Sequence, residues 1–389
     1  MEVGIVGKPN VGKSTFFKAL TLADAEIANF PFTTIKANIG VGYVRSECPC
    51  KAHNLKCNPR NSICRGGVRF TPVKLIDVAG LVPGAHEGKG LGNQFLDDLR
   101  QANALIHVVD ISGKTNSLGE PDEGHDPEDD IKFLIDEVDL WFAAIVTRNW
   151  AKVKNKIKYE NKKMVEELMG ILAGLGIAEW QIKKTLDDTG LTGNMDWTEE
   201  DCKRFAIRLR HISKPIIIAA NKIDQGRANF DRLKGKYEMI PLCAEAELAL
   251  READKNKLIE YIPGDADFKL TGQPDEKKAK ALEYIREKIL KPYNGTGAQE
   301  AMNKAACHVL NLITVYPVEN ENKMCDGKGM VLPDSFLMPN GCTALEMAYK
   351  IHTDIGGKFI GAIDCRTKMK VGRDHKLKEG DVIKIIAGR

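Results

Sequence analysis

A glycine-rich loop near the start of the sequence is the first group of residues that could do chemistry. From Gly7 to Ser14 it reads Gly-Lys-Pro-Asn-Val-Gly-Lys-Ser, between a strand-like and a helix-like run, which is the pattern of a phosphate-binding loop. Lys13 would reach the β- and γ-phosphates and the Ser14 hydroxyl would coordinate Mg²⁺. An ordinary glycine turn is the alternative. The residues expected to contact a nucleotide are Gly7, Pro9, Asn10, Val11, Gly12, Lys13, Ser14 and Thr15.

A second motif closes the strand-like run that starts at Val73. It is the DxxG sequence from Asp77 to Gly80. We expect Asp77 to bind Mg²⁺ through water and the Gly80 amide to meet the γ-phosphate. This motif alone is weak evidence, because a surface turn can have the same sequence.

A third motif, Asn221-Lys-Ile-Asp224, follows the apolar run 215–220. Asp224 can accept two hydrogen bonds from the N1–H and 2-amino groups of guanine. Adenine lacks that pair of donors, so the residue predicts selection of GTP. A weaker fourth element follows the predicted strand 237–242, with the Ala244 amide near the guanine O6. The residues expected to hold the base are Asn221, Lys222, Asp224, Cys243, Ala244 and Glu245.

The motifs occur in order at the ends of predicted strands, where an open α/β sheet binds its ligands. The chain has 389 residues, enough for two or three domains, and its 43% apolar content can form proper cores. A net charge of +3 is too small to indicate nucleic-acid binding by the whole chain. No run approaches the roughly 18 apolar residues of a membrane span, so we expect no membrane partner and a cytoplasmic location. We also expect a monomer.

The sequence as a whole resembles the Obg-like GTPases, specifically the YchF branch in its archaeal form. The resemblance covers nearly the whole chain and rests on the phosphate loop, on 29–34, on the stretch 77–93 and on the C-terminal segment. It implies the α/β fold of a P-loop GTPase, a mostly parallel sheet with helices on both faces, with an inserted helical arm and a C-terminal β-grasp (TGS) domain. Many YchF relatives have an altered guanine motif and prefer ATP. Because Asn221–Asp224 is intact here, we favour GTP and keep ATP as the alternative.

The resemblance also bears on hydrolysis. Leu81 follows Gly80 where Ras-like proteins carry the glutamine that orients the attacking water, so a slow intrinsic rate is implied. Asn10 matches a position that helps to bind K⁺ in related potassium-activated GTPases; a plain loop hydrogen bond is the alternative. His86 could approach the γ-phosphate, although a solvated loop histidine is the more ordinary interpretation.

The segments around these residues are expected to act as switches. By family position, Thr34 rather than Thr33 should complete the Mg²⁺ shell when GTP is bound. The stretch after Asp77 has little conformational preference of its own, so contact with the γ-phosphate could order it. The glycines responsible are Gly80, Gly84, Gly88, Gly90 and Gly92.

Four of the ten cysteines lie close together in the sequence, at Cys48, Cys50, Cys57 and Cys64. They could form a Cys₄ site, because thiolates bind Zn²⁺ tetrahedrally. The CxC start departs from the usual CxxC spacing. Structural thiols are the alternative, or disulfides if the source is a hyperthermophile.

Helical patterns fill the long gap between Asp77 and Asn221. We expect one helix to start at Asp126-Pro127, a second to carry Ile157 to Leu172, and a third to run from Thr198 to Lys214. Basic residues on these helices could track a phosphate backbone, although a solvated helix face is the ordinary explanation. These residues are Lys152, Lys154, Lys156, Lys158, Lys203, Arg204, Arg208 and Arg210.

Strand patterns return after Leu312 and resemble the TGS domain, which points to RNA or the ribosome by fold analogy only. Six basic residues gather near its end: Arg366, Lys368, Lys370, Arg373, Lys376 and Lys378. We expect a GTP-binding domain over 1–275 with the arm at about 120–213, a helical connector over 276–310 and the TGS domain over 311–389.

The predicted function is a GTP-hydrolysing switch whose nucleotide state alters an RNA-facing surface, on the ribosome or on other RNA. The alternatives are an ATP-preferring regulatory ATPase and a metal- or redox-responsive binding protein in which nucleotide is structural.

Overall fold

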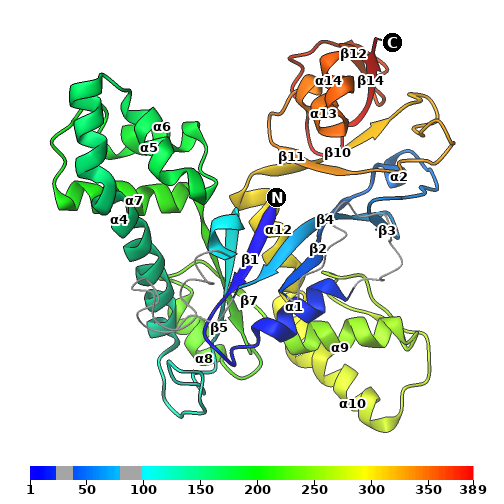
Figure 1. The fold of residues 1–389 in the computed structure, drawn as a ribbon. Coiled ribbons are helices and arrows are strands. Elements are labelled where there is room, and N and C mark those ends of the chain that lie inside the picture. Colours follow the sequence, from blue (N-terminus) through cyan, green and yellow to red (C-terminus); the bar gives the residue numbers. More distant parts are fainter. Residues whose placement is uncertain (23–37, 79–97, 389) are drawn as a thin grey trace.

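The computed structural model describes residues 1–22, 38–78 and 98–388 (Figure 1). A seven-stranded sheet with the order β2-β4-β1-β5-β6-β7 forms its centre, and β3 pairs with β4. The pairs β1·β4, β1·β5, β5·β6 and β6·β7 are parallel, whereas β2 and β3 run antiparallel to β4. The strands are β1 (Glu2–Val6), β2 (Ile39–Glu47), β3 (Ile63–Arg65), β4 (Val68–Asp77), β5 (Ala104–Asp110), β6 (Ile216–Asn221) and β7 (Met239–Pro241).

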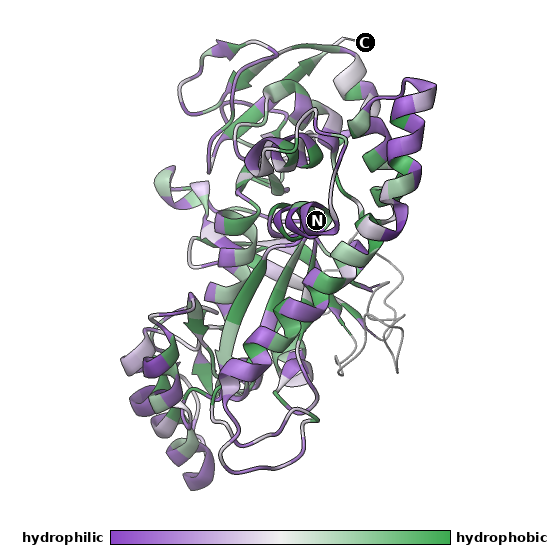
Figure 2. Cartoon of the chain, turned by 90° about the vertical axis from the view of Figure 1, so that its left-hand side faces the viewer, coloured by the Kyte–Doolittle hydropathy of each residue, from purple (hydrophilic) through white to green (hydrophobic). Residues whose placement is uncertain are grey.

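The middle strands are mostly apolar, as expected of strands that helices cover on both faces. All seven residues of β5 are buried. Ile106 and Val108 of this strand pack in the cluster that contains Phe16, while Leu105 and Val109 belong to clusters on the other face. Figure 2 shows the hydrophobic strands of the sheet and the mixed hydropathy of the helices around them. The mostly parallel P-loop GTPase architecture expected from the sequence is confirmed.

The helices around the sheet come from distant parts of the chain. They are α1 (Lys13–Thr21), α8 (Arg227–Leu233), α9 (Ala244–Lys255), α10 (Glu276–Ile285), α11 (Lys291–Tyr293) and α12 (Ala298–Asn303). Two π-helical turns, 286–290 and 304–309, extend α10 and α12. A short helix, α2 (Pro49–Ala52), follows β2, and a small hairpin joins β8 (Ile259–Glu260) to β9 (Lys269–Leu270).

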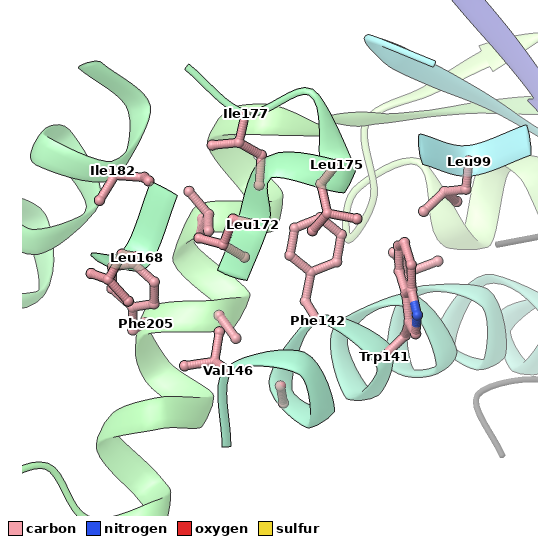
Figure 3. Packing of buried hydrophobic residues seen from close by; sticks show 14 of the residues in the cluster. Leu99, Trp141, Phe142, Val146, Leu168, Leu172, Leu175, Ile177, Ile182 and Phe205 are labelled. Carbon is pink, nitrogen blue, oxygen red and sulfur yellow. The ribbon is translucent and has the colours of Figure 1, made fainter. Parts of the chain in front are cut away.

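The inserted arm consists of α4 (Pro127–Glu160), α5 (Met164–Leu172), α6 (Glu179–Thr189) and α7 (Glu199–Ser213). Asp126 caps α4 by accepting a 2.9 Å hydrogen bond from the amide of Glu128, and Thr198 forms a capping box on α7. Phe142, Leu168 and Phe205 meet in the core of the arm (Figure 3). The helical insert is therefore confirmed.

The division of the arm into three helices was wrong. Ile157 lies in α4, which continues to Glu160 as a 34-residue helix, so the second helix begins only at Met164. Trp150 of α4 stacks on Trp197 with 3.9 Å between ring centroids. A separate helix, α6, fills the stretch before Trp197.

The C-terminal unit has a five-stranded sheet of order β11-β10-β14-β12-β13, in agreement with the expected TGS fold. Its strands are β10 (Leu312–Val318), β11 (Phe336–Pro339), β12 (Phe359–Asp364), β13 (Lys370–Val371) and β14 (Val382–Ala387), and its helices are α13 (Ala344–Ile351) and α14 (Thr353–Gly357). Within the described ranges, no helix has the length and apolar character needed to cross a bilayer.

Candidate functional site

The phosphate loop joins β1 to α1 in the conformation that its glycines allow. Gly7 has φ 151° and Gly12 has φ 95°, values that side chains with a Cβ rarely adopt. A Cβ on Gly7 would lie 2.5 Å from the carbonyl oxygen of Val108, and one on Gly12 would collide with the Asn221 amide nitrogen. Lys13 begins α1, and burial lowers its pKa while the nearby Asp77 carboxylate opposes that shift. The loop therefore presents a partly desolvated lysine at a helix N-terminus, as phosphate binding requires.

The two described residues that we expect to hold Mg²⁺ lie together. Asp77 ends β4 opposite Ile5 of β1, which places it beside the phosphate loop. Its side chain is hydrogen-bonded to Ser14. Burial raises the pKa of Asp77, and the charge of Lys13 lowers it. The buried Asp77 Oδ1 has no hydrogen-bond partner among the described residues, so it is a free hard-oxygen acceptor that fits Mg²⁺ or its water shell.

Asn221 connects the phosphate loop to the 243–245 segment. Its amide nitrogen donates to the Val11 carbonyl oxygen over 2.7 Å, and its Oδ1 accepts from the Ala244 amide over 3.0 Å. One side chain thus fixes the phosphate loop against the 243–245 segment. Both contacts span more than twenty residues of sequence, so only the fold brings these groups together.

The rest of the predicted base site gathers around this residue. Lys222, with φ 61°, bonds to Asp110 Oδ2 over 2.7 Å. Asp224 is half-buried and accepts a 3.7 Å contact from the thiol of Cys243. Glu245 is exposed at the start of α9. Asp224 therefore keeps carboxylate surface available for a ligand beside the loop.

Three predicted site residues, Thr34, Gly80 and His86, lie outside the described residues, as does Leu81.

A clamp on the phosphate loop was missed by the sequence reasoning. The Lys8 ammonium, in a side chain only 4% exposed, forms a 2.7 Å ion pair with Asp130 of α4 and donates to the Thr115 carbonyl over 2.7 Å. Asn10 Nδ2 donates to the Gly119 carbonyl over 2.9 Å. These partners are more than a hundred residues away in sequence, and no local pattern marks them.

The contact of Asn10 bears on the expected K⁺ site. Because its amide nitrogen is held by Gly119, its Oδ1 is the atom directed elsewhere, and no described residue donates a hydrogen bond to it. An amide oxygen is a suitable ligand for a hard cation. The loop hydrogen bond named as the alternative is therefore present, and Oδ1 remains a candidate cation ligand.

The four cysteines Cys48, Cys50, Cys57 and Cys64, called the thiol cluster below, converge. Their sulfur atoms all lie within 4.8 Å of one another. All ten cysteines of the chain are free, so the disulfide alternative is not realised in the structure. Hydrogen bonding to Cys64 and the adjacent Arg69 lower the pKa of Cys48, whereas burial raises that of Cys50.

The basic residues of the arm are mostly paired. Lys154, Lys156 and Arg208 form salt bridges of 2.5–2.7 Å with Asp196, Glu167 and Asp188. Lys203 and Arg204 pair with acidic residues of their own helix. Arg210 is 2% exposed and bonded to Asp139, so its assignment to an RNA-facing surface was wrong.

The basic residues of the C-terminal unit differ from those of the arm in their exposure. All six of its predicted basic residues are exposed: Arg366, Lys368, Lys370, Arg373, Lys376 and Lys378.

Comparison with protein-family models gives three matches. Residues 2–146 match a model described as 50S ribosome-binding GTPase, residues 219–320 match the Obg-like GTPase YGR210-like, G4 motif-containing domain, and residues 323–387 match the TGS domain.

Similar proteins extend along the whole chain. The uncharacterized GTP-binding protein MJ1332 of Methanocaldococcus jannaschii is 51% identical over 99% of this chain and 98% of its own. The ribosome-binding ATPase YchF of Buchnera aphidicola subsp. Acyrthosiphon pisum is 28% identical over 98% of both chains. Among solved structures, a GTP-binding protein from Pyrococcus horikoshii OT3 is 39% identical, with a TM-score of 0.82 and complete coverage of both chains.

Proposed function

Because the chain belongs to the Obg-like GTPases of the YGR210/MJ1332 type, which are related to YchF and carry a C-terminal TGS domain, we propose that it is a GTP-hydrolysing switch acting on the ribosome or RNA. The observation that carries the nucleotide assignment is Asn221, which joins the phosphate loop to the segment expected to meet the base. Because one side chain holds both the phosphate loop and the 243–245 segment, we expect binding of the phosphates and binding of the base to depend on each other.

Guanine selection is assigned to Asp224. Lys222 is anchored on Asp110, and the Ile223 amide donates to the Leu242 carbonyl, so the backbone on the N-terminal side of Asp224 is fixed. A preorganised carboxylate matches the paired donors of guanine and leaves adenine with an unsatisfied contact. The name of the YchF relative, an ATPase, supports ATP as the alternative, and the intact Asn221–Asp224 motif argues against it.

For hydrolysis, Ser14 and Asp77 would hold Mg²⁺, which when bound neutralises charge on the β- and γ-phosphates. Lys13 would stabilise the same phosphates from the helix N-terminus. Asn10 Oδ1 would be a ligand of K⁺, and the charge of that ion would offset the negative charge that develops in the transition state. Since Leu81 cannot orient water, turnover should be slow and stimulated by K⁺.

The ribosome assignment rests on what similar proteins are named for and on the charge of the TGS domain. One matched family model is described as a ribosome-binding GTPase, and YchF is named a ribosome-binding ATPase. The exposed basic residues of the TGS domain offer suitable chemistry for RNA phosphates.

The nucleotide assignment is tested by competitive binding of GTP and ATP with Mg²⁺, using wild type, Asp224→Ala and, as a control away from the nucleotide motifs, Glu200→Ala, an exposed residue on α7 of the arm. We expect a strong GTP preference that only the Asp224 change abolishes. Equal or better binding of ATP by the wild type would mean that Asp224 does not select the base and that the ATPase alternative is correct.

Turnover is measured on the same preparations in K⁺ and in Na⁺. Slow GTP hydrolysis, faster in K⁺ and reduced by Lys13→Ala, is expected. Negligible turnover together with metal-dependent binding of a partner would favour the remaining alternative, a metal-responsive protein in which nucleotide is structural.

A further inference from the structure

The thiol cluster has the size of a metal centre. A tetrahedral Zn²⁺ site with Zn–S bonds of about 2.3 Å places its sulfurs about 3.8 Å apart. Cys50 and Cys64 already lie 3.8 Å apart, and no pair among the four exceeds 4.8 Å. Side chains from a 17-residue stretch therefore converge on one point, and only small rotamer adjustments separate them from tetrahedral ligation.

Secondary structure holds these positions. Cys48 follows the end of β2 and precedes α2, and its amide donates to the Gly67 carbonyl over 2.9 Å. Cys50 lies in α2, and Cys64 lies in β3 opposite Arg69 of β4. Three of the four thiols are thus fixed by the sheet and the short helix, and Cys57 comes from the loop between them.

A buried charge beside the cluster indicates that it holds an anionic centre. Arg69 is fully buried, and its guanidinium donates to Cys48 Sγ over 3.4 Å, to Ser62 Oγ over 2.8 Å and to the Leu332 carbonyl over 3.0 Å. No carboxylate lies within salt-bridge distance of it among residues 1–22, 38–78 and 98–388. A buried cation without a counter-charge is strongly unfavourable. A divalent ion held by four thiolates has a net charge of −2 and would supply that counter-charge.

The cluster also lies where the TGS domain contacts the N-terminal domain. Cys48 and Cys50 pack in one hydrophobic cluster with Tyr316, Met324 and Leu332.

The loop that contains Cys57 continues this contact. The Asn58 amide donates to the Val331 carbonyl over 2.8 Å, and the Arg60 amide to the Pro333 carbonyl over 2.7 Å. Asn61 and Ser335 exchange hydrogen bonds of 3.0 and 3.1 Å. Any ligand that fixes this loop consequently fixes the TGS domain.

We propose that Cys48, Cys50, Cys57 and Cys64 bind one Zn²⁺ ion as a structural tetrathiolate site that fastens the TGS domain to the N-terminal domain. Each thiol that binds releases its proton to solvent, and nothing is oxidised or reduced. With four protein ligands the ion has no open position, so its role is structural and not catalytic.

The first experiment measures metal in the full-length protein purified without added metal. We expect about one zinc per chain in the wild type and strong loss of zinc in Cys57→Ser. Cys307→Ser, a half-buried cysteine outside the cluster, is the matched control and should keep its zinc. Absence of stoichiometric metal, or stoichiometric iron in place of zinc, would overturn the assignment.

Co²⁺ added to chelator-treated protein reports the geometry. Intense visible d–d bands and a thiolate charge-transfer band, saturating at one Co²⁺ per chain and absent in Cys57→Ser, are expected of a tetrahedral thiolate site. Weak octahedral-type absorption would contradict it. Nucleotide binding by the same samples should be retained, which separates metal loss from misfolding and from failure of the proposed GTPase function.

The fastening role is tested by limited proteolysis. Chelation under reducing conditions should expose the 319–335 segment to cleavage, and added Zn²⁺ should restore protection. Zinc that binds with no change in cleavage would overturn the structural role even though the site exists.

Discussion

At the scale of single residues, the phosphate loop is determined by steric limits as much as by charge. Gly12 combines a left-handed backbone with direct contact to Asn221, so it is constrained by the neighbouring motif as well as by phosphate binding. The sequence pattern predicted the loop because glycine and lysine spacing is local information. It could not predict the Asn221 bridge, which depends on the ends of β1 and β6 lying on either side of β5 in the sheet.

Gly12→Ala should strongly impair nucleotide binding. A left-handed alanine costs about 1–2 kcal/mol, and its Cβ would also displace the Asn221 amide. Gly170→Ala is the matched control, because Gly170 lies in helix α5 with open space around its Cα. That change should leave binding intact and stabilise the fold by up to about 1 kcal/mol. Titration of a fluorescent GTP analogue and urea unfolding measure both effects; equal affinities in the two variants would contradict the prediction.

His107, under the phosphate loop on β5, makes stability depend on pH. Burial, with the charges of Lys13 and Lys8, lowers its pKa to about 3. The unfolded chain, with a histidine pKa of about 6.5, binds the proton more readily than the folded chain does. Stability is therefore fully present above about pH 6.5 and falls as pH decreases toward 3, by at most about 1.4 kcal/mol per pH unit from this group. Urea unfolding between pH 5 and 7.5 should show a shallower slope for His107→Gln; identical slopes would exclude the effect.

At the scale of elements, helix α4 is both a wall of the arm and a support for the phosphate loop. Its first turn supplies Asp130 to Lys8, and its far end supplies Trp150 to the core of the arm. One continuous 34-residue helix therefore joins the phosphate loop to the core of the arm.

Asp130→Asn should weaken nucleotide binding and lower stability. It leaves the buried Lys8 ammonium without its carboxylate, and breaking one side of a buried ion pair costs about 3–5 kcal/mol. Asp129→Asn, one residue earlier and exposed, is the control and should change neither property. Removing both charges in Lys8→Met with Asp130→Leu should recover part of the stability. Thermal unfolding with and without GTP measures these differences. If Asp130→Asn changes neither stability nor nucleotide binding, the Lys8–Asp130 ion pair does not support the phosphate loop.

The elements also show where sequence reasoning succeeds. The caps at Asp126 and Thr198 were predictable because capping is a local hydrogen-bonding pattern. The length of α4 was not, since its apolar periodicity continues smoothly into residues that were assigned to the next helix. The pairing of arm cations with carboxylates could not be predicted either. Lys154 and Asp196, for example, pair although they lie on different segments.

At the scale of the whole molecule, the arm and the TGS domain project from the same central sheet (Figure 1). Their surfaces differ in charge. Most cations of the arm form salt bridges with neighbouring carboxylates. In the TGS domain, four exposed cations have no salt-bridge partner among the described residues: Lys370, Arg373, Lys376 and Lys378. Of the two candidate RNA-facing surfaces, the TGS domain is therefore the stronger.

Lys370→Glu combined with Arg373→Glu should weaken binding to ribosomes and reduce its dependence on salt. Each cation that no longer neutralises a phosphate lowers the slope of log affinity against log salt by roughly one unit. Lys203→Glu with Arg204→Glu is the matched control on the arm, because those cations are already paired with Glu199 and Asp201 and have less free charge to offer phosphates. Co-sedimentation with ribosomes at several KCl concentrations, with a GTP analogue bound, measures both pairs. If the arm variant loses more affinity than the TGS variant, the arm is the RNA-facing surface in spite of its paired charges; if neither loses affinity, recognition of the ribosome is not carried by these cations.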